Sequence, residues 1–241
     1  MGRESTQAQA AGHRRRGRSR RPVYSHAMAS LTPRDADAVQ AHLAASNRFL
    51  VQQVLRPLGN EYRISIPAKG SVEEGEAQLF VKQKKLSIKE DIRFRLSPDV
   101  EAHLFMIKAR TMFEFAGRND VTDAAGNQLG VLSKDFAKSL LRSHWIVKGH
   151  DDTLLFEAHE ASWPIAIIRR LAEFLPYGLS ALTFLPFNFT LVRDGQQVGT
   201  YSRVLGKLRD RYVLELGPGL EDADRRVVLA FAVALDALQD R

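Results

Sequence analysis

The sequence predicts a mainly β protein: a closed antiparallel barrel of about twelve strands around a buried, hydrophobic C-terminal helix. Three observations predict this fold. Short runs rich in Val, Ile, Leu, Phe and Thr recur between turn residues, part of the chain is weakly repeated, and nine consecutive apolar residues lie near the C-terminus, Val227–Leu235. Many short strands would expose aggregation-prone edges in an open sheet, so closure into a barrel is favoured.

The candidate strands share β-branched and aromatic residues and are bounded by turn sequences such as Arg-Asp-Gly-Gln. They are residues 48–55, 61–67, 78–84, 103–108, 111–116, 120–123, 128–133, 144–148, 153–159, 187–193, 197–203 and 210–216.

The weak repeat joins two distant parts of the chain. Residues 126–134 resemble residues 194–203, and residues 141–145 align with residues 208–212. The pattern of each copy predicts a hairpin turn, a strand, a short connecting segment and a second strand. The aromatic residue at the end of each copy, Trp145 or Tyr212, is expected to anchor the core or the rim of the barrel, since large aromatic side chains mainly supply packing.

Three segments favour helices. Residues 33–45 predict a short helix, and residues 162–174 begin like a helix, with Ser162 at the N-cap position and Pro164 in the first turn. In residues 225–238, the nine apolar residues would span only about 14 Å as a helix, whereas a bilayer core needs about 20 such residues. We therefore expect the C-terminal segment to fill the barrel rather than cross a membrane; a strand is the alternative.

The net charge of +7 is concentrated at the N-terminus. Residues 1–30 hold seven arginines against one glutamate, so the remaining residues are almost neutral. We expect residues 1–30 to form a disordered basic tail that the mature protein need not retain, and residues 31–241 to form a single domain. A nearly neutral body predicts no specific nucleic-acid binding.

The tail allows several interpretations. It lacks the apolar stretch of a secretory signal, but Gly2 and Thr6 match the loose myristoylation pattern, and a lipid plus a basic patch can anchor a protein. The alternatives are a solvated tail or a true start at Met28.

Catalysis and metal binding find little support in the sequence. The chain has no cysteine, which excludes disulfides and thiolate chemistry, and it contains no nucleophile elbow, zincin motif or phosphate-binding glycine loop. The nearest metal-like group is His150, Asp151 and Asp152 with Glu157, His159 and Glu160. A hairpin turn explains residues 149–152 without an ion, so we expect no metal, no cofactor and no enzymatic activity.

At several places the sequence resembles the tubby-like superfamily, in particular its scramblase-like and LURP-one-related branch. The matching stretches are residues 80–87, 121–130 and 144–147, followed by Phe189–Leu191, Asp194–Gln196, Gly199, Asp210–Tyr212 and the apolar segment 226–238. The resemblance implies a twelve-stranded barrel threaded by a hydrophobic helix, and binding rather than catalysis, with phosphoinositide contact or phospholipid scrambling known among relatives. The chain lacks the cysteine cluster and the acidic calcium loop of the scramblase branch, which argues against calcium-triggered scrambling here.

The basic residues of the body supply candidate sites for a lipid head group. Lys82, Lys84 and Lys85 form its densest basic group, and Arg169 and Arg170 adjoin an apolar stretch that suits an interfacial helix. A solvated outer face and a helix that caps the barrel are the alternatives.

The sequence thus predicts a non-catalytic, monomeric barrel in the cytoplasm, without a transmembrane span, that binds anionic phospholipid or a protein partner, peripherally at the inner membrane face. A scramblase-like membrane-associated protein and an unrecognised enzyme are the alternatives.

Overall fold

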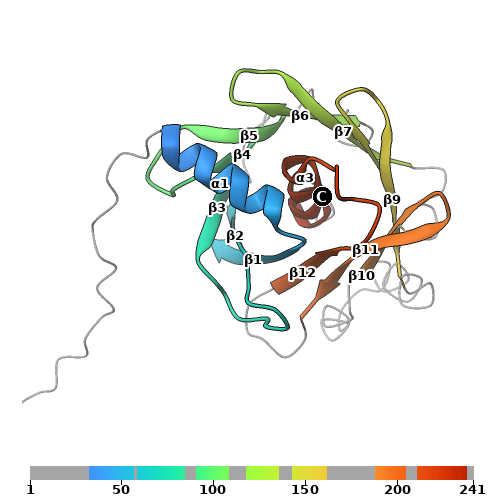
Figure 1. The fold of residues 1–241 in the computed structure, drawn as a ribbon. Coiled ribbons are helices and arrows are strands. Elements are labelled where there is room, and N and C mark those ends of the chain that lie inside the picture. Colours follow the sequence, from blue (N-terminus) through green and yellow to red (C-terminus); the bar gives the residue numbers. More distant parts are fainter. Residues whose placement is uncertain are drawn as a thin grey trace, which may run out of the picture.

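A computed structural model describes residues 33–56, 59–84, 91–108, 118–135, 143–161, 188–204 and 211–237. These residues form a closed antiparallel barrel of twelve strands with one helix inside it and another across one end (Figure 1). The predicted fold class, a mainly β barrel around a buried C-terminal helix, is confirmed.

The strands follow one another around the barrel in chain order, and β1 pairs with β12 to close it. The strands are β1 Arg48–Arg56, β2 Gly59–Ser65, β3 Ala77–Lys84, β4 Ile92–Arg95, β5 His103–Lys108, β6 Arg118–Asp123, β7 Gln128–Lys134, β8 His144–Gly149, β9 Leu154–Glu160, β10 Asn188–Arg193, β11 Gln196–Arg203 and β12 Arg211–Leu216. The helices are α1 Pro33–Ala45 and α3 Arg225–Ala237.

Both terminal helices lie where the sequence places them, and every described strand except one has a predicted counterpart whose ends differ by two residues at most. Strand β4, Ile92–Arg95, was not predicted. The predicted strand at residues 111–116, the predicted helix at residues 162–174 and the basic tail lie outside the described residues.

Helix α3 is enclosed by the ring of strands (Figure 1) and is buried on every side from Val227 to Leu235. Its Phe231 meets the rings of Trp145 and Phe156 edge to face, with centroids 6.3 and 5.2 Å away. Burial all round explains why the segment has no polar stripe. The interpretation of this segment as the core of the barrel is therefore confirmed, and the strand alternative is wrong.

Polar contacts fix both ends of α3. At its start, Arg225 is buried and donates hydrogen bonds to the backbone carbonyls of Ser46, Leu220 and Ala223 and to Oδ1 of Asn47. Preceding it, Asp224 accepts a hydrogen bond from the backbone N–H of Arg226, as an N-cap residue does.

At the other end, the hydroxyls of Tyr62 and Tyr212 donate to Asp236 over 2.9 and 3.1 Å. The helix is thus held at a fixed depth in the barrel.

The two copies of the repeat fold alike where the structure describes them. Each begins at the turn of a hairpin, β6–β7 or β10–β11, and in each hairpin the strand register shifts next to the pair that contains a glycine, Gly130 or Gly199. At the far end of each copy a basic residue pairs across strands with an aromatic one, Lys134 with Trp145 and Arg203 with Tyr212. Both aromatic side chains are buried, as predicted.

Candidate functional site

The outer face of β2, β3 and β4 gathers basic side chains from three adjacent strands. Along β3, Leu79 and Val81 point into the core, so Phe80 and Lys82 point outward. The same alternation buries Tyr62 and turns its neighbours on β2 outward.

Strand register arranges these outward side chains in two rows. In one row, Phe80 lies opposite Arg63 on one side and Arg95 on the other. In the next row, Lys82 lies opposite Glu61 and Arg93. Lys82 therefore lies between one like charge, which repels it, and one opposite charge, which attracts it.

The three arginines have carboxylate partners. Arg95 makes a two-pronged contact with Glu101 at 3.1 and 3.0 Å, Arg63 lies 3.6 Å from Glu74, and Arg93 lies 4.0 Å from Asp91.

Lys82 differs from these arginines. It is exposed, and it makes no hydrogen bond or ion pair with any residue that the structure describes. We call Arg63, Phe80, Lys82, Arg93 and Arg95 the basic face.

A small hollow of about 90 Å³ opens on the basic face. It is lined by Glu61, Tyr62, Arg63, Phe80, Val81, Lys82, Arg95 and Pro98. The hollow has room for a small charged group but not for a drug-sized ligand, whose pockets span about 300–1,000 Å³.

Two arginines of this face act on a nearby histidine. Partial burial, together with the charges of Arg93 and Arg95, lowers the pKa of His103 below its usual 6.5. Its backbone lies opposite Arg95 across β4 and β5, and the ring Nε2 is buried without a hydrogen-bond partner among the described residues.

The structure locates only part of the predicted lipid site. Lys82 belongs to the basic face, and Lys84 ends β3 with its side chain outside the description. The other three predicted residues, Lys85, Arg169 and Arg170, lie outside the described residues.

The three arginines of the basic face were not predicted, because they come together only through the pairing of β2, β3 and β4. The alternation in Ile92-Arg93-Phe94-Arg95 was the available signal, since it places both arginines on one side of a strand.

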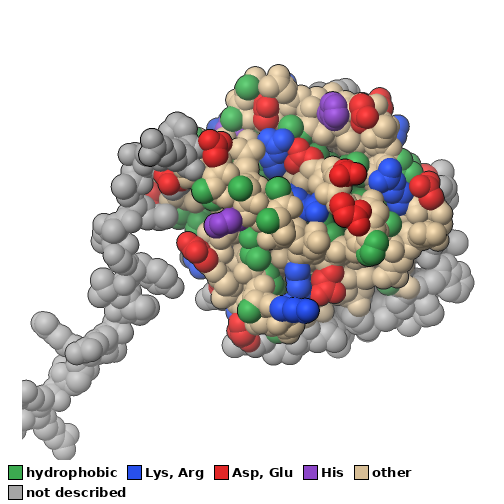
Figure 2. Space-filling view, in the orientation of Figure 1, with side chains coloured by type: hydrophobic (Ala, Val, Ile, Leu, Met, Phe, Trp, Pro, Cys, Tyr) green, Lys and Arg blue, Asp and Glu red, His purple; other side chains and the backbone are tan. Residues whose placement is uncertain are grey.

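A larger cleft of about 560 Å³ lies between α1 and the segment that leads into α3. Arg226 donates hydrogen bonds there to Asp224 at 2.6 Å and to Gln40 of α1 at 3.4 Å. Its guanidinium group therefore already has partners that fix the start of α3. At this end of the barrel, acidic and basic side chains are interspersed (Figure 2). The cleft is therefore a weaker candidate for an anion site than the basic face.

The metal-like group noted in the sequence is divided by the structure. Asp151 accepts hydrogen bonds from the backbone N–H and the hydroxyl of Thr153 within the β8–β9 turn, which confirms the predicted hairpin. On β9, Glu160 is buried with Phe156 and Ala158, whereas Glu157 and His159 share the outer face.

Within the described part of the chain, neither helix has the length and hydropathy required to cross a bilayer.

No match to the chain is found among curated proteins. A model of the LURP-one-related family does match it, over residues 77–236. This range runs from the start of β3 to the last turn of α3, so it covers most of the barrel and nearly all of the helix inside it. The family resemblance expected from the sequence is thereby confirmed, and the chain belongs to the LURP-one-related family of the tubby-like superfamily.

Proposed function

We propose that this protein is a non-catalytic barrel that binds the head group of an anionic phospholipid through its basic face, peripherally at the inner face of a membrane. The observation that carries the proposal is Lys82, an exposed cation directly opposite Arg93 and without an ion pair among the described residues. Proteins of the tubby-like barrel family are generally non-catalytic, which supports binding rather than catalysis.

The energetics of the basic face favour exchange of its carboxylates for phosphate. Ion pairs on a surface typically contribute only about 0–1 kcal/mol. The pairs of Arg63 and Arg93, at 3.6 and 4.0 Å, are long even for such contacts. A phosphate offers several acceptor oxygens to Arg and Lys at once, so it can displace these carboxylates at low cost.

Phe80 gives the basic face an apolar centre. Its ring is partly exposed between Arg63 and Arg95. A partly exposed aromatic ring among cations suits the boundary between lipid head groups and acyl chains, where one side is charged and the other apolar.

Vesicle co-sedimentation tests the proposal. Vesicles that contain phosphatidylserine or a phosphoinositide should sediment the chain, and vesicles of phosphatidylcholine alone should not. Because the seven arginines of the tail would bind anionic lipid themselves, the measurement is made on the full chain and on a chain without residues 1–30.

Two sets of variants separate the basic face from general charge. Replacing Lys82, Lys84 and Lys85 together by alanine should weaken binding to anionic vesicles by at least tenfold, and Lys82→Ala with Arg93→Ala should do the same. Lys148→Ala removes a lysine of β8 that lies 3.8 Å from Asp152, and it should leave binding nearly unchanged. Equal binding by wild type and by both sets of variants would eliminate this surface and point to a protein partner or another lipid contact.

A further inference from the structure

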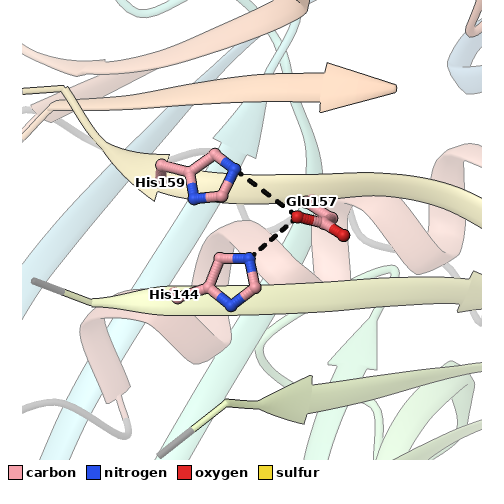
Figure 3. A group of neighbouring side chains, drawn as sticks. All are labelled: His144, Glu157 and His159. Atoms are coloured by element: carbon pink, nitrogen blue, oxygen red, sulfur yellow. Dashed lines mark hydrogen bonds and ion pairs between the residues drawn. The ribbon is translucent and has the colours of Figure 1, made fainter. Parts of the chain in front are cut away.

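Three side chains on the outer face of β8 and β9 converge on one point. His144 and His159 are directly opposite each other across the two strands, and Glu157 lies on β9 on the same face as His159. One oxygen of Glu157, Oε2, is 3.0 Å from Nε2 of His144 and 3.6 Å from Nε2 of His159 (Figure 3). The two imidazole rings stack, with their centroids 4.5 Å apart.

The spacing of these atoms matches that of the ligands of a small metal ion. Ligands about 2.0–2.1 Å from a tetrahedral Zn²⁺ lie roughly 3.3 Å from one another, and the two measured distances fall on either side of this value. One potential ligand atom from each of the three residues lies within 4.8 Å of the others. Small rotations of the side chains would therefore suffice to surround an ion.

Burial restricts His144, one of the three potential ligands, even without a bound ion. His144 is only 1% exposed, whereas His159 and Glu157 are 23% and 33% exposed. Oδ2 of Asp135 lies 3.3 Å from Nδ1 of His144, on the opposite side of the ring from Glu157, as an ion-pair contact that does not have hydrogen-bond geometry. Metal-binding histidines characteristically present their second nitrogen to a carboxylate, which fixes the ring and raises its basicity.

The donor set selects the kind of ion. Two imidazoles and one carboxylate suit Zn²⁺ and its neighbours in the first transition row, whereas Mg²⁺ and Ca²⁺ prefer oxygen ligands alone. The partial exposure of Glu157 and His159 leaves a side open to solvent for a water ligand.

We propose that His144, Glu157 and His159 form a binding site for a divalent transition-metal ion, with Zn²⁺ as the best fit, and that the bound ion clips β8 to β9. No metal site was predicted from the sequence, and His144 was not among the residues of the metal-like group. The pairing of His144 with His159 follows only from the register of β8 and β9. The proposal is independent of lipid binding, since the site lies on strands that do not border β2, β3 or β4.

The test uses the full chain after treatment with a chelator and dialysis. Calorimetric titration with Zn²⁺ should show one equivalent bound with micromolar or tighter affinity, and Ca²⁺ and Mg²⁺ should not bind the site. A hundredfold excess of Zn²⁺ over the Kd should raise the Tm by about 5 °C or more. Co²⁺ should give the visible absorption of an ion with nitrogen and oxygen ligands.

The variants avoid the buried histidine, whose loss would disturb folding. His159→Ala and Glu157→Gln should each weaken Zn²⁺ binding by at least tenfold and abolish the rise in Tm. Asp135→Asn should weaken binding by roughly tenfold through the orientation of His144. His150→Ala removes an exposed histidine of the adjacent turn and should retain the full equivalent.

Failure of the wild-type chain to bind Zn²⁺ would overturn the proposal. So would equal binding by wild type, His159→Ala and Glu157→Gln, because the metal would then sit elsewhere, for example on the histidines of the tail. Lipid binding by the basic face would be unaffected in either case.

Discussion

Asp236 places a negative charge at the C-terminal end of α3, where the helix dipole is also negative. The two tyrosine hydroxyls that donate to this carboxylate compensate for the unfavourable position. The two tyrosines also come from distant parts of the chain, β2 and β12, which lie on either side of β1 where the barrel closes. One carboxylate therefore joins the helix to both ends of the sheet.

We expect Asp236→Ala to lower the free energy of unfolding by about 2–4 kcal/mol, since hydrogen bonds to a charged group contribute about 1.5–3 kcal/mol each and two buried hydroxyls would lose their acceptor. Tyr62→Phe and Tyr212→Phe should each lower it by about 1–2 kcal/mol. Denaturant unfolding of the single and double variants checks this, and fully additive effects of Asp236→Ala and Tyr62→Phe would show that the hydrogen bond contributes nothing.

His103 reports on the charge of the basic face. Because burial and the charges of Arg93 and Arg95 lower its pKa in the folded chain, the unfolded chain binds more protons between that lowered value and the usual 6.5. Stability contributed by this residue is therefore complete above pH 6.5 and is lost as the pH falls through 6.5 towards the lowered pKa.

NMR titration of the His103 ring should give a pKa below 6.5 in the wild-type chain. Arg93→Gln with Arg95→Gln should raise it, and an anionic head group bound at the basic face should raise it too, since both reduce the positive charge near the ring. A pKa that is unchanged in the double variant would mean that these arginines do not act on the histidine.

At the scale of the structural element, Gly130 lets β7 and α3 approach closely. A Cβ at this position would lie 2.5 Å from the carbonyl oxygen of Lys148 and 2.9 Å from both methyl carbons of Val227. Its counterpart in the repeat, Gly199, would be similarly close to the carbonyl oxygen of Glu215, at 2.6 Å. The repeated glycine therefore reflects a repeated steric requirement.

Gly130→Ala should lower the free energy of unfolding by about 1–3 kcal/mol, the usual effect of forcing extra volume into a packed core. Gly217→Ala is a matched control, because its nearest contact would be a carbonyl oxygen at 3.3 Å, and it should have a smaller effect. Equal Tm values for Gly130→Ala and wild type would show that the helix can shift without loss.

The sequence predicted those elements whose signal is local. Alternating strands between turns and an apolar segment without a polar side can be recognised from neighbouring residues, and so the barrel and α3 were found. Strand β4 was missed because it has only four residues, two of them arginines, and lacks the apolar run by which the other strands were recognised.

The candidate sites were less predictable because both depend on contacts between strands. Lys82 was identified from its basic neighbours in sequence, but Arg63 and Arg93 join it only through register. His144 lies fifteen residues before His159, and nothing in their spacing shows that they stack; their pairing through β8 and β9 brings the rings together.

At the scale of the whole molecule, the barrel and α3 cannot fold separately. Eleven residues of α3 are buried, including the large apolar side chains of Val227, Val228, Leu229, Phe231, Val233 and Leu235. Burial of one such side chain contributes about 1.5–3 kcal/mol, so six contribute roughly 9–18 kcal/mol. The whole stability of a domain is typically about 5–15 kcal/mol, which the loss of the helix would therefore cancel.

Deletion of residues 225–241 should abolish folding, because the strands would enclose an empty apolar interior that water or aggregation must fill. The expected result is loss of the cooperative thermal transition in circular dichroism and recovery of the chain in the insoluble fraction. Deletion of residues 1–30 is the control, and it should leave the transition unchanged because that tail is rich in arginine and has few apolar residues larger than alanine to bury. A truncated chain without residues 225–241 that still unfolds cooperatively would mean that the segment is an appendage of a self-sufficient barrel, as a membrane anchor would be. The buried contacts of Phe231 with β8 and β9 argue for the first outcome, since no anchor packs its central aromatic ring against the core of its own domain.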